Sequence, residues 1–243
     1  MKKIQRYIAL LVFVSIPYLV VGQQETVKTI LPKVINTYQT TPNYHIAMTY
    51  EMHRGTGANG AMVKSYSGDF VKQNEFSMLK MLNSEKLNFG KEQVLIDHDS
   101  KAIEYQKSTA KQAAIAPVDL SYLLTYYEET SVVRKNGILI CSLSRSPKYK
   151  IPLPYSTIVL HIDEEKAIMK KQLLVFANKM PFTSKNNEEV YDQGTLVITL
   201  KHDFEQKEKV AYALNDYIDI SADGMLQPSE NYKAYQLIDR TKK

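Results

Sequence analysis

A strict alternation of apolar residues with smaller or more polar ones over residues 44–53 constrains this fold more than any other feature. Tyr44, Ile46, Met48, Tyr50 and Met52 occupy every second position of this segment. Because successive side chains of a β-strand point to opposite faces of a sheet, the pattern predicts a strand with one buried face. An amphipathic helix would need apolar residues at a spacing of three and four instead.

Similar short apolar runs, bounded by turn-forming residues, predict further strands along the chain. These lie at 61–72, 75–82, 93–97, 102–106, 131–145, 156–162, 167–177, 194–203 and 234–239. Apolar residues at helical spacing predict one helix over 27–38, with Pro32 inside it, and a second over 117–128. Strands and helices do not alternate regularly, so the sheet is expected to be antiparallel.

The first residues have the composition of a secretory signal peptide. Lys2, Lys3 and Arg6 precede an apolar run that ends at Gly22. The run holds about 15 residues, whereas a membrane span needs about 20; a retained membrane anchor is the alternative interpretation. We therefore expect a signal peptide at 1–22 and one single domain at 23–243, located in the periplasm or secreted, with no membrane span after cleavage.

Charge and cysteine usage exclude several classes of protein. Removal of the predicted signal peptide lowers the formal net charge from +5 to +2, because it removes Lys2, Lys3 and Arg6 and no acid. So small a charge argues against nucleic acid as a partner. Cys141 is the only cysteine, so the sequence has no internal disulfide and no cysteine after the apolar run for lipidation. Its apolar neighbours predict a buried and unreactive thiol.

No motif points to catalysis, a cofactor or a metal. Residues 55–60 spell G-x-G-x-x-G, but the segment after them has the pattern of a strand, and a dinucleotide site needs a helix there. His45 and His53 are too far apart along one strand to share an ion. His161 and Asp163 are close enough, but no third ligand is visible. The hydrolase motifs G-x-S-x-G, H-E-x-x-H and S-x-x-K are absent from the sequence. We predict a protein that is not an enzyme, without catalytic residues, although carboxylates from distant strands could still converge.

Several segments resemble the outer-membrane lipoprotein carrier family (LolA/LolB-like). They are Gly68-Asp69-Phe70-Val71-Lys72, with Phe76 shortly after it, and the pair Val94–Asp97 and Lys101–Tyr105. The resemblance implies a mostly β fold in which a curved antiparallel sheet forms an incomplete barrel around two or more helices. It also implies an apolar cavity for acyl chains. In that family an arginine and a proline follow the lysine, and here Gln73 and Asn74 stand in those positions.

The resemblance and the content of 17 Tyr and 9 Met suggest an exported carrier in the cell envelope, which transports an acyl chain, a lipoprotein or another apolar ligand. The predicted ligand-binding residues are Tyr50, Met52, Phe76, Met78, Tyr105 and Leu124. The first strand is expected to share a concave face with Phe76, Met78, Ile103 and Tyr105, covered by Leu120, Leu123 and Leu124. Two alternatives are an ordinary filled core and an accessory envelope protein that binds other envelope proteins through this fold.

Overall fold

The computed structural model describes residues 25–107, 120–183, 186–205 and 211–241. The predicted signal peptide and the start of the second predicted helix lie outside these residues. In chain order the elements of the large sheet are β1 (Asn43–Arg54), β2 (Ala61–Gln73), β3 (Phe76–Met81), β4 (Ser84–Phe89), β5 (Glu92–Asp97), β6 (Ala102–Lys107), β7 (Tyr127–Lys135), β8 (Ile138–Arg145), β9 (Tyr155–Asp163), β10 (Ile168–Phe176), β13 (Gly194–Asp203) and β16 (Gln236–Asp239). The other elements are α2 (Val27–Thr40), α3 (Leu120–Tyr126), β11 (Met180–Thr183), β12 (Glu189–Asp192), η2 (Leu214–Asp216), β14 (Ile218–Ile220), β15 (Leu226–Pro228) and η3 (Glu230–Tyr232).

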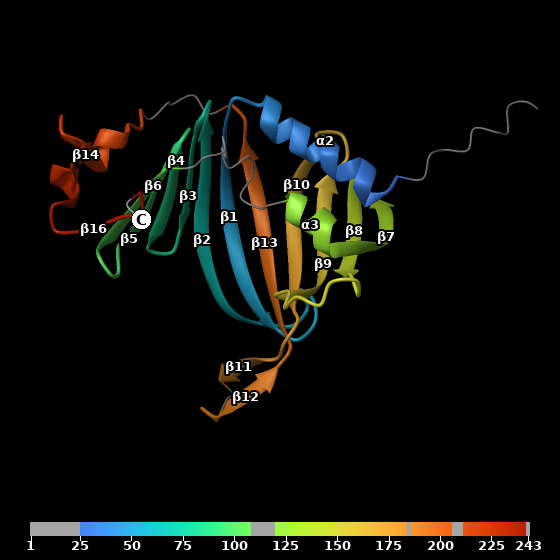
Figure 1. Ribbon diagram of the computed structural model, residues 1–243. Coiled ribbons are helices and arrows are strands. Elements are labelled where there is room, and N and C mark those ends of the chain that lie inside the picture. The colour runs from blue at the N-terminus through green and yellow to red at the C-terminus, as the bar shows by residue number, and fades with distance from the viewer. Residues whose placement is uncertain (1–24, 108–119, 184–185, 206–210, 242–243) are drawn as a thin grey trace, which may run out of the picture.

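The large sheet has 12 strands in the order β16-β6-β5-β4-β3-β2-β1-β13-β10-β9-β8-β7. Its strand pairs are antiparallel except that of β16 with β6, which is parallel. The sheet curves around α2 and α3 without closing into a barrel (Figure 1). This is the mostly β, incompletely closed architecture that the sequence resemblance implies.

The alternating residues of β1 point to the concave face of the sheet, beneath α2. Tyr50 lies opposite Tyr66 of β2 on one side and opposite Ile198 of β13 on the other. Residues opposite one another on neighbouring strands point to the same face, so these side chains form one layer. The helix α2 packs against this layer with a stripe of buried residues: Val27, Ile30, Leu31, Val34 and Tyr38. The predicted first strand and first helix are thus both confirmed.

A second apolar cluster lies on the opposite face of the sheet. Phe70 lies opposite Leu79, whose side chain belongs to the concave cluster, so the neighbouring Met78 points the other way. Leu87, Val94 and Tyr105 follow Met78 across β4, β5 and β6. The C-terminal segment, residues 211–241, covers this face with Tyr217 and Ile218.

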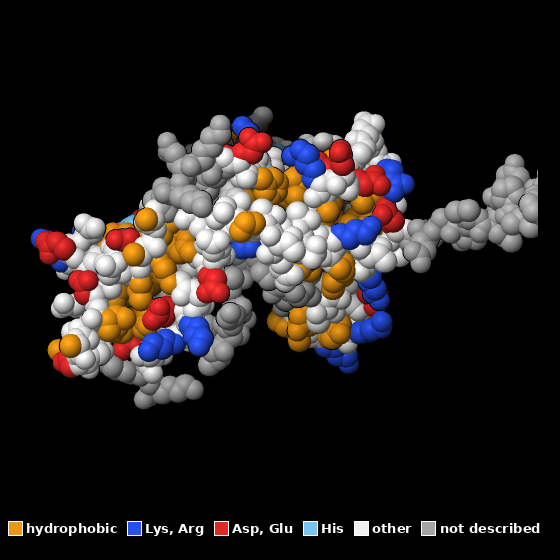
Figure 2. Space-filling model, turned by 90° about the horizontal axis from the view of Figure 1, so that it is seen from above, with side chains coloured by type: hydrophobic (Ala, Val, Ile, Leu, Met, Phe, Trp, Pro, Cys, Tyr) orange, Lys and Arg blue, Asp and Glu red, His pale blue; other side chains and the backbone are white. Residues whose placement is uncertain are grey.

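The expectation that Phe76, Met78, Ile103 and Tyr105 join the concave face is therefore wrong. All four belong to the cluster under the C-terminal segment. Apolar alternation shows that a strand has a buried face, but it does not show to which side of the sheet that face turns. The space-filling view from above shows hydrophobic side chains in two separate areas, one at the end with the C-terminal segment and one at the α2 and α3 end (Figure 2).

The local predictions differ from the structure mainly at turns. Residues 131–145 are not one strand but part of the β7–β8 hairpin, which turns at Asn136-Gly137. Both residues have positive φ, 51° and 73°, as an Asn-Gly hairpin turn requires. The second predicted helix is short in its described part, because β7 already begins at Tyr127. The G-x-G-x-x-G sequence connects β1 to β2 as a hairpin loop, as expected.

Cys141 lies on β8 in the middle of the concave cluster, and its side chain is 0% exposed. Burial, aided by the charges of Glu129 and Glu25, raises the pKa of its thiol to about 11. The native protein is therefore expected to resist a bulky thiol reagent at pH 8 for hours and to react rapidly once unfolded in urea. Rapid labelling of the native protein, followed by mass spectrometry, would contradict this placement of β8.

Candidate ligand-binding cavity

A cavity of about 540 Å³ opens between the N-terminal end of α2, the junction of α3 with β7, and the end of β8. Its volume lies within the range of small-ligand sites in proteins. It is lined by Thr26, Val27, Lys28, Leu124, Thr125, Tyr127, Glu128, Glu129, Leu143, Ser146, Lys148 and Tyr149.

The lining divides into an apolar inner part and a charged rim. Val27, Tyr127 and Leu143 are buried members of the concave cluster, and Leu124 is half-buried beside them. Lys28 and Lys148 are exposed at the rim. Such an arrangement suits an amphiphilic ligand, because the apolar part can leave water while a charged group stays in it.

The rim contains a polar contact between β7 and the residue that follows β8. Ser146 is 2% exposed, and its Oγ donates to Glu128 Oε1 at 2.8 Å. Lys148 Nζ lies 3.0 Å from the same oxygen. The hydrogen bond from Ser146, and then that from Lys148, lower the pKa of the Glu128 carboxyl, which is therefore ionised at neutral pH. Because its pKa is lowered, the Glu128 carboxylate is a weak base for activating the Ser146 hydroxyl as a nucleophile.

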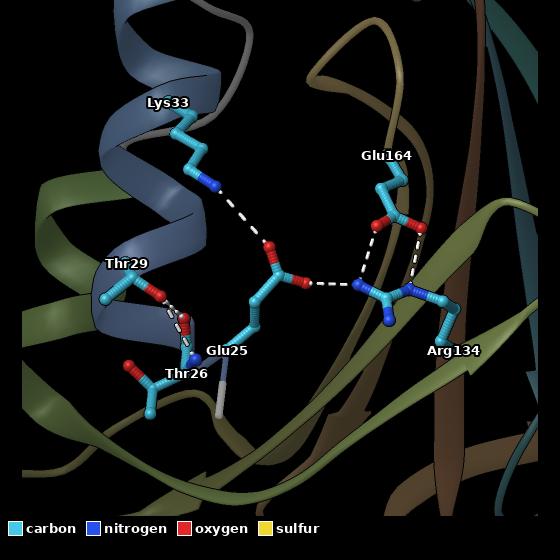
Figure 3. A network of polar contacts seen from close by, with 6 residues as sticks. All are labelled: Glu25, Thr26, Thr29, Lys33, Arg134 and Glu164. Carbon is cyan, nitrogen blue, oxygen red and sulfur yellow. Dashed lines mark hydrogen bonds and ion pairs between the residues drawn. The ribbon is translucent and has the colours of Figure 1, made fainter. Parts of the chain in front are cut away.

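The N-terminal end of α2, which forms one wall of the cavity, is fixed by carboxylates. Glu129 Oε2 accepts the backbone N–H of Val27, so it satisfies a donor in the first turn of the helix. Glu25 contacts Lys33 at 3.4 Å and Arg134 at 2.8 Å, and Arg134 also pairs with Glu164 (Figure 3). This network joins the helix to the β7–β8 and β9–β10 turns. The ion pairs are largely exposed, so they position the wall more than they stabilise the fold.

A second cavity of about 520 Å³ adjoins the first along the loop between β8 and β9, residues 146–154. Ser146 and Tyr149 line both cavities. The ring of Tyr149 packs edge-on against Tyr126 at 5.1 Å between centroids. The β8–β9 loop therefore separates the larger cavity from the second one and forms part of the lining of both.

Of the residues predicted to bind a ligand, the structure brings only Leu124 into the larger cavity. Tyr50 is buried in the concave cluster, where its hydroxyl donates to Met48 Sδ at 3.3 Å and its ring stacks on Tyr66. Met52 is half-buried further along the same strand. Phe76, Met78 and Tyr105 lie on the opposite face of the sheet.

The rim residues Lys28, Glu128, Ser146, Lys148 and Tyr149 were missed by sequence reasoning. The composition of the segment around Lys148 and Tyr149 could have indicated some of these residues. Residues 142–162 contain no acid, while Arg145, Lys148 and Lys150 stand close together there among the prolines 147, 152 and 154. A basic, proline-rich connection between two strands is unusual for a simple turn.

Two of the histidines form contacts within the β1–β2 hairpin. His45 Nε2 lies 2.8 Å from Asp69 Oδ1, and His53 Nδ1 lies 2.9 Å from the carbonyl oxygen of Gly60. Burial lowers the pKa of His161. No group of three or more His, Cys, Asp or Glu residues that could hold a metal ion occurs among the described residues.

Comparisons with known proteins find likenesses in structure only. No protein-family model matches the chain, and no curated protein has a similar sequence. An uncharacterised conserved protein from Thermus thermophilus is 9% identical, with a TM-score of 0.43; 88% of this chain and 98% of that one are covered. A DUF1329 family protein from Desulfovibrio piger is 12% identical, with a TM-score of 0.37, covering 76% and 95%. A LolA superfamily protein from Nitrosomonas europaea is 10% identical, with a TM-score of 0.31, covering 73% and 92%.

In the part of the chain that the structure describes, no helix is both long and apolar enough to cross a membrane.

Proposed function

We propose that this protein is an exported, non-catalytic binding or carrier protein that holds the acyl chain of an amphiphilic ligand in the larger cavity. The observation that carries the proposal is the division of the cavity into an apolar inner wall and a rim with Lys28 and Lys148. Its signal-peptide-like first residues support a location in the periplasm or outside the cell. The cavity would recognise the hydrocarbon chain, which the acyl chain of a lipoprotein and a free fatty acid have in common.

A short acyl chain gains enough from burial to bind with measurable affinity. Each methylene transferred from water contributes about 0.8 kcal/mol, so a chain of about ten methylenes outweighs the cost of immobilising it. Lys28 would hold a carboxylate or phosphate group at the rim by charge-assisted hydrogen bonds, and Lys148 would add a second donor beside its contact with Glu128. Leu124 would contact the chain, whereas the deeper Tyr50 and Met52 would be reached only by a chain that passes beneath α2.

Displacement of a fluorescent fatty acid tests this function. The wild type is expected to bind the probe with micromolar affinity and to release it to unlabelled palmitate. Leu124→Glu is expected to weaken binding about tenfold or more, because it places a carboxylate against the chain. Met78→Glu is the matched control, since Met78 is also half-buried but lies on the opposite face. A wild type that binds no apolar probe would overturn the proposal.

A second set of variants separates the head group from the chain. Replacement of both Lys28 and Lys148 by Gln is expected to weaken fatty-acid binding several-fold while leaving binding of the matching fatty alcohol nearly unchanged. Met52→Glu measures how far the chain extends along β1. If Met78→Glu abolishes binding and Leu124→Glu does not, the ligand lies under the C-terminal segment instead.

An accessory envelope protein is the second candidate. The observation that favours it is the exposed edge of the sheet at β7, where Val133 is 52% exposed. An exposed edge strand can pair with a strand of another protein. Crosslinking from residue 133 in the native envelope would identify such a partner.

A further inference from the structure

The β8–β9 loop presents apolar and basic side chains side by side at the surface. Tyr149 and Ile151 are 41% and 45% exposed. Lys148 and Lys150 flank Tyr149, Arg145 lies four residues before it, and all three cations are also exposed. Exposure of apolar side chains to water is unfavourable. Two of them set among cations therefore suggest a contact surface.

The loop carries a surplus of positive charge. Lys148 is paired with Glu128 at 3.0 Å, while neither Arg145 nor Lys150 forms an ion pair with another described residue. On the neighbouring wall, Lys28 is exposed near the same carboxylate. The unpaired cations would therefore be available to an anionic partner without first breaking a contact within the protein.

The backbone and the aromatic ring of the loop are restrained before any partner arrives. Pro147, Pro152 and Pro154 limit the backbone, and Tyr149 is held against Tyr126 by the edge-on ring contact. Contact with a partner would therefore order few groups, which keeps the entropic cost of binding low.

We propose that the β8–β9 loop docks the protein on an anionic lipid surface. Tyr149 and Ile151 enter the interfacial region of the bilayer, where a tyrosine ring can keep its hydroxyl in water. Arg145 and Lys150 face the lipid phosphates, whose charge is complementary to theirs. This proposal goes beyond the binding of a ligand in the cavity, and it holds whether or not the cavity takes an acyl chain.

Docking through one loop is expected to be weak, reversible and dependent on salt. A few apolar side chains and a few cations together support reversible binding of the protein to the membrane surface, not permanent anchoring. The electrostatic part acts within about 10 Å at moderate ionic strength and should weaken as salt is added. Bound protein should therefore be released from vesicles by high salt.

Co-sedimentation of the purified mature protein, without the predicted signal peptide at 1–22, with vesicles tests the proposal. The probe is a vesicle of phosphatidylcholine with about one third phosphatidylglycerol, compared with phosphatidylcholine alone. The wild type is expected to bind the anionic vesicles at least about tenfold more tightly. Lys150→Glu is expected to weaken that binding about 30-fold, since it changes two units of charge, and Ile151→Ser to weaken it about tenfold.

The variants are chosen so that the loop and the cavity can be told apart. Lys150 and Ile151 line the adjoining cavity but not the larger one, so both variants should keep the affinity for the fatty-acid probe. Leu124→Glu should keep vesicle binding. The matched controls are Lys86→Glu and Leu82→Ser on the β3–β4 hairpin, where both residues are also exposed, and these should leave vesicle binding unchanged.

Circular dichroism confirms that each variant is folded before its binding is compared. Equal binding to neutral and anionic vesicles, or no binding to either, would overturn the proposal. Binding that is lost equally in the loop variants and in the β3–β4 controls would also overturn it, because the attraction would then be a general effect of charge. Capture of a protein by the loop, without vesicle binding, would assign the surface to a protein partner instead.

Discussion

Replacing Lys72 with methionine is expected to lower the free energy of unfolding by about 3 kcal/mol, because it removes charge-assisted hydrogen bonds to three carbonyls at the end of α2. Lys72 lies on β2 and is 6% exposed. Its Nζ donates to the carbonyl oxygens of Tyr38 at 2.7 Å, Gln39 at 3.3 Å and Thr41 at 2.9 Å. These carbonyls end α2, whose last turn has no basic residue of its own. A cation from the sheet therefore caps the helix and complements its dipole.

The loss would be measured by urea unfolding, followed by circular dichroism, with Lys86→Met as the control. Lys86 is exposed on β4, so its replacement should change stability by less than about 0.5 kcal/mol. A Lys72→Met variant as stable as the wild type would show that water satisfies the carbonyls at the end of α2 and that the cap contributes little.

The pH dependence of the free energy of unfolding provides an independent test of the burial of Lys72. Burial lowers the pKa of Lys72 below that of a lysine in the unfolded chain. Between these two pKa values the unfolded state binds more protons at this site, so Lys72 contributes stability that rises with pH towards the unfolded value, against the loss that buried tyrosines with raised pKa values cause over the same range. Lys72→Met should lack this rise. The capping contact and the cost of burying the charge can thus be measured separately.

Most strands of the sheet could be predicted because the alternation of apolar and polar residues along a strand directly reflects the burial of one of its faces. The strand at 44–52, the helix with Pro32 and the hairpin around Asp99-Ser100 all have patterns that depend only on neighbouring residues. The turn at Asn136-Gly137 was also readable in principle, since that dipeptide favours a tight hairpin. The strand β4 was missed because its residues, Ser84–Phe89, are mostly polar.

The candidate site was harder to predict, because it depends on contacts between distant segments. Glu129 reaches the backbone of Val27 only after the sheet has curled around α2, and Ser146 reaches Glu128 only once β7 and β8 have paired. Leu124 was identified because a helix covering the concave face must point some apolar residues inward. The placement of Met78 and Tyr105 failed because the register of β2 against β3, and the C-terminal cover, are not encoded in either strand alone.

Ile218→Asp is expected to detach the C-terminal segment from the sheet and to destabilise it by at least about 3 kcal/mol, because a carboxylate would be buried without a partner. Ile218 is 1% exposed and lies in the cluster that contains Leu87, Val94, Ile96, Ile103 and Tyr105. Release of the segment would uncover these residues together. The variant is therefore expected to bind the dye ANS strongly and to self-associate during gel filtration.

The chain contains a closely matched control for this change. Ile220 lies two residues further along β14, on the same side of the strand, and is 48% exposed. Ile220→Asp introduces the same charge into the same strand and should leave both the dye fluorescence and the elution volume unchanged. Equal effects of the two substitutions would mean that the strand, and not the buried contact, is being disturbed.

Loss of the cover would also remove β16 from the edge of the sheet and leave β6, still paired with β5, as the edge strand. An edge strand beside an exposed apolar face favours association with further chains, which explains why the covering segment both pairs with β6 and packs over it. The concave cluster beneath α2 does not include the covering residues. Binding of the fatty-acid probe should therefore survive in the monomeric fraction of Ile218→Asp, and its loss there would place the ligand under the C-terminal segment, next to Phe76, Met78 and Tyr105.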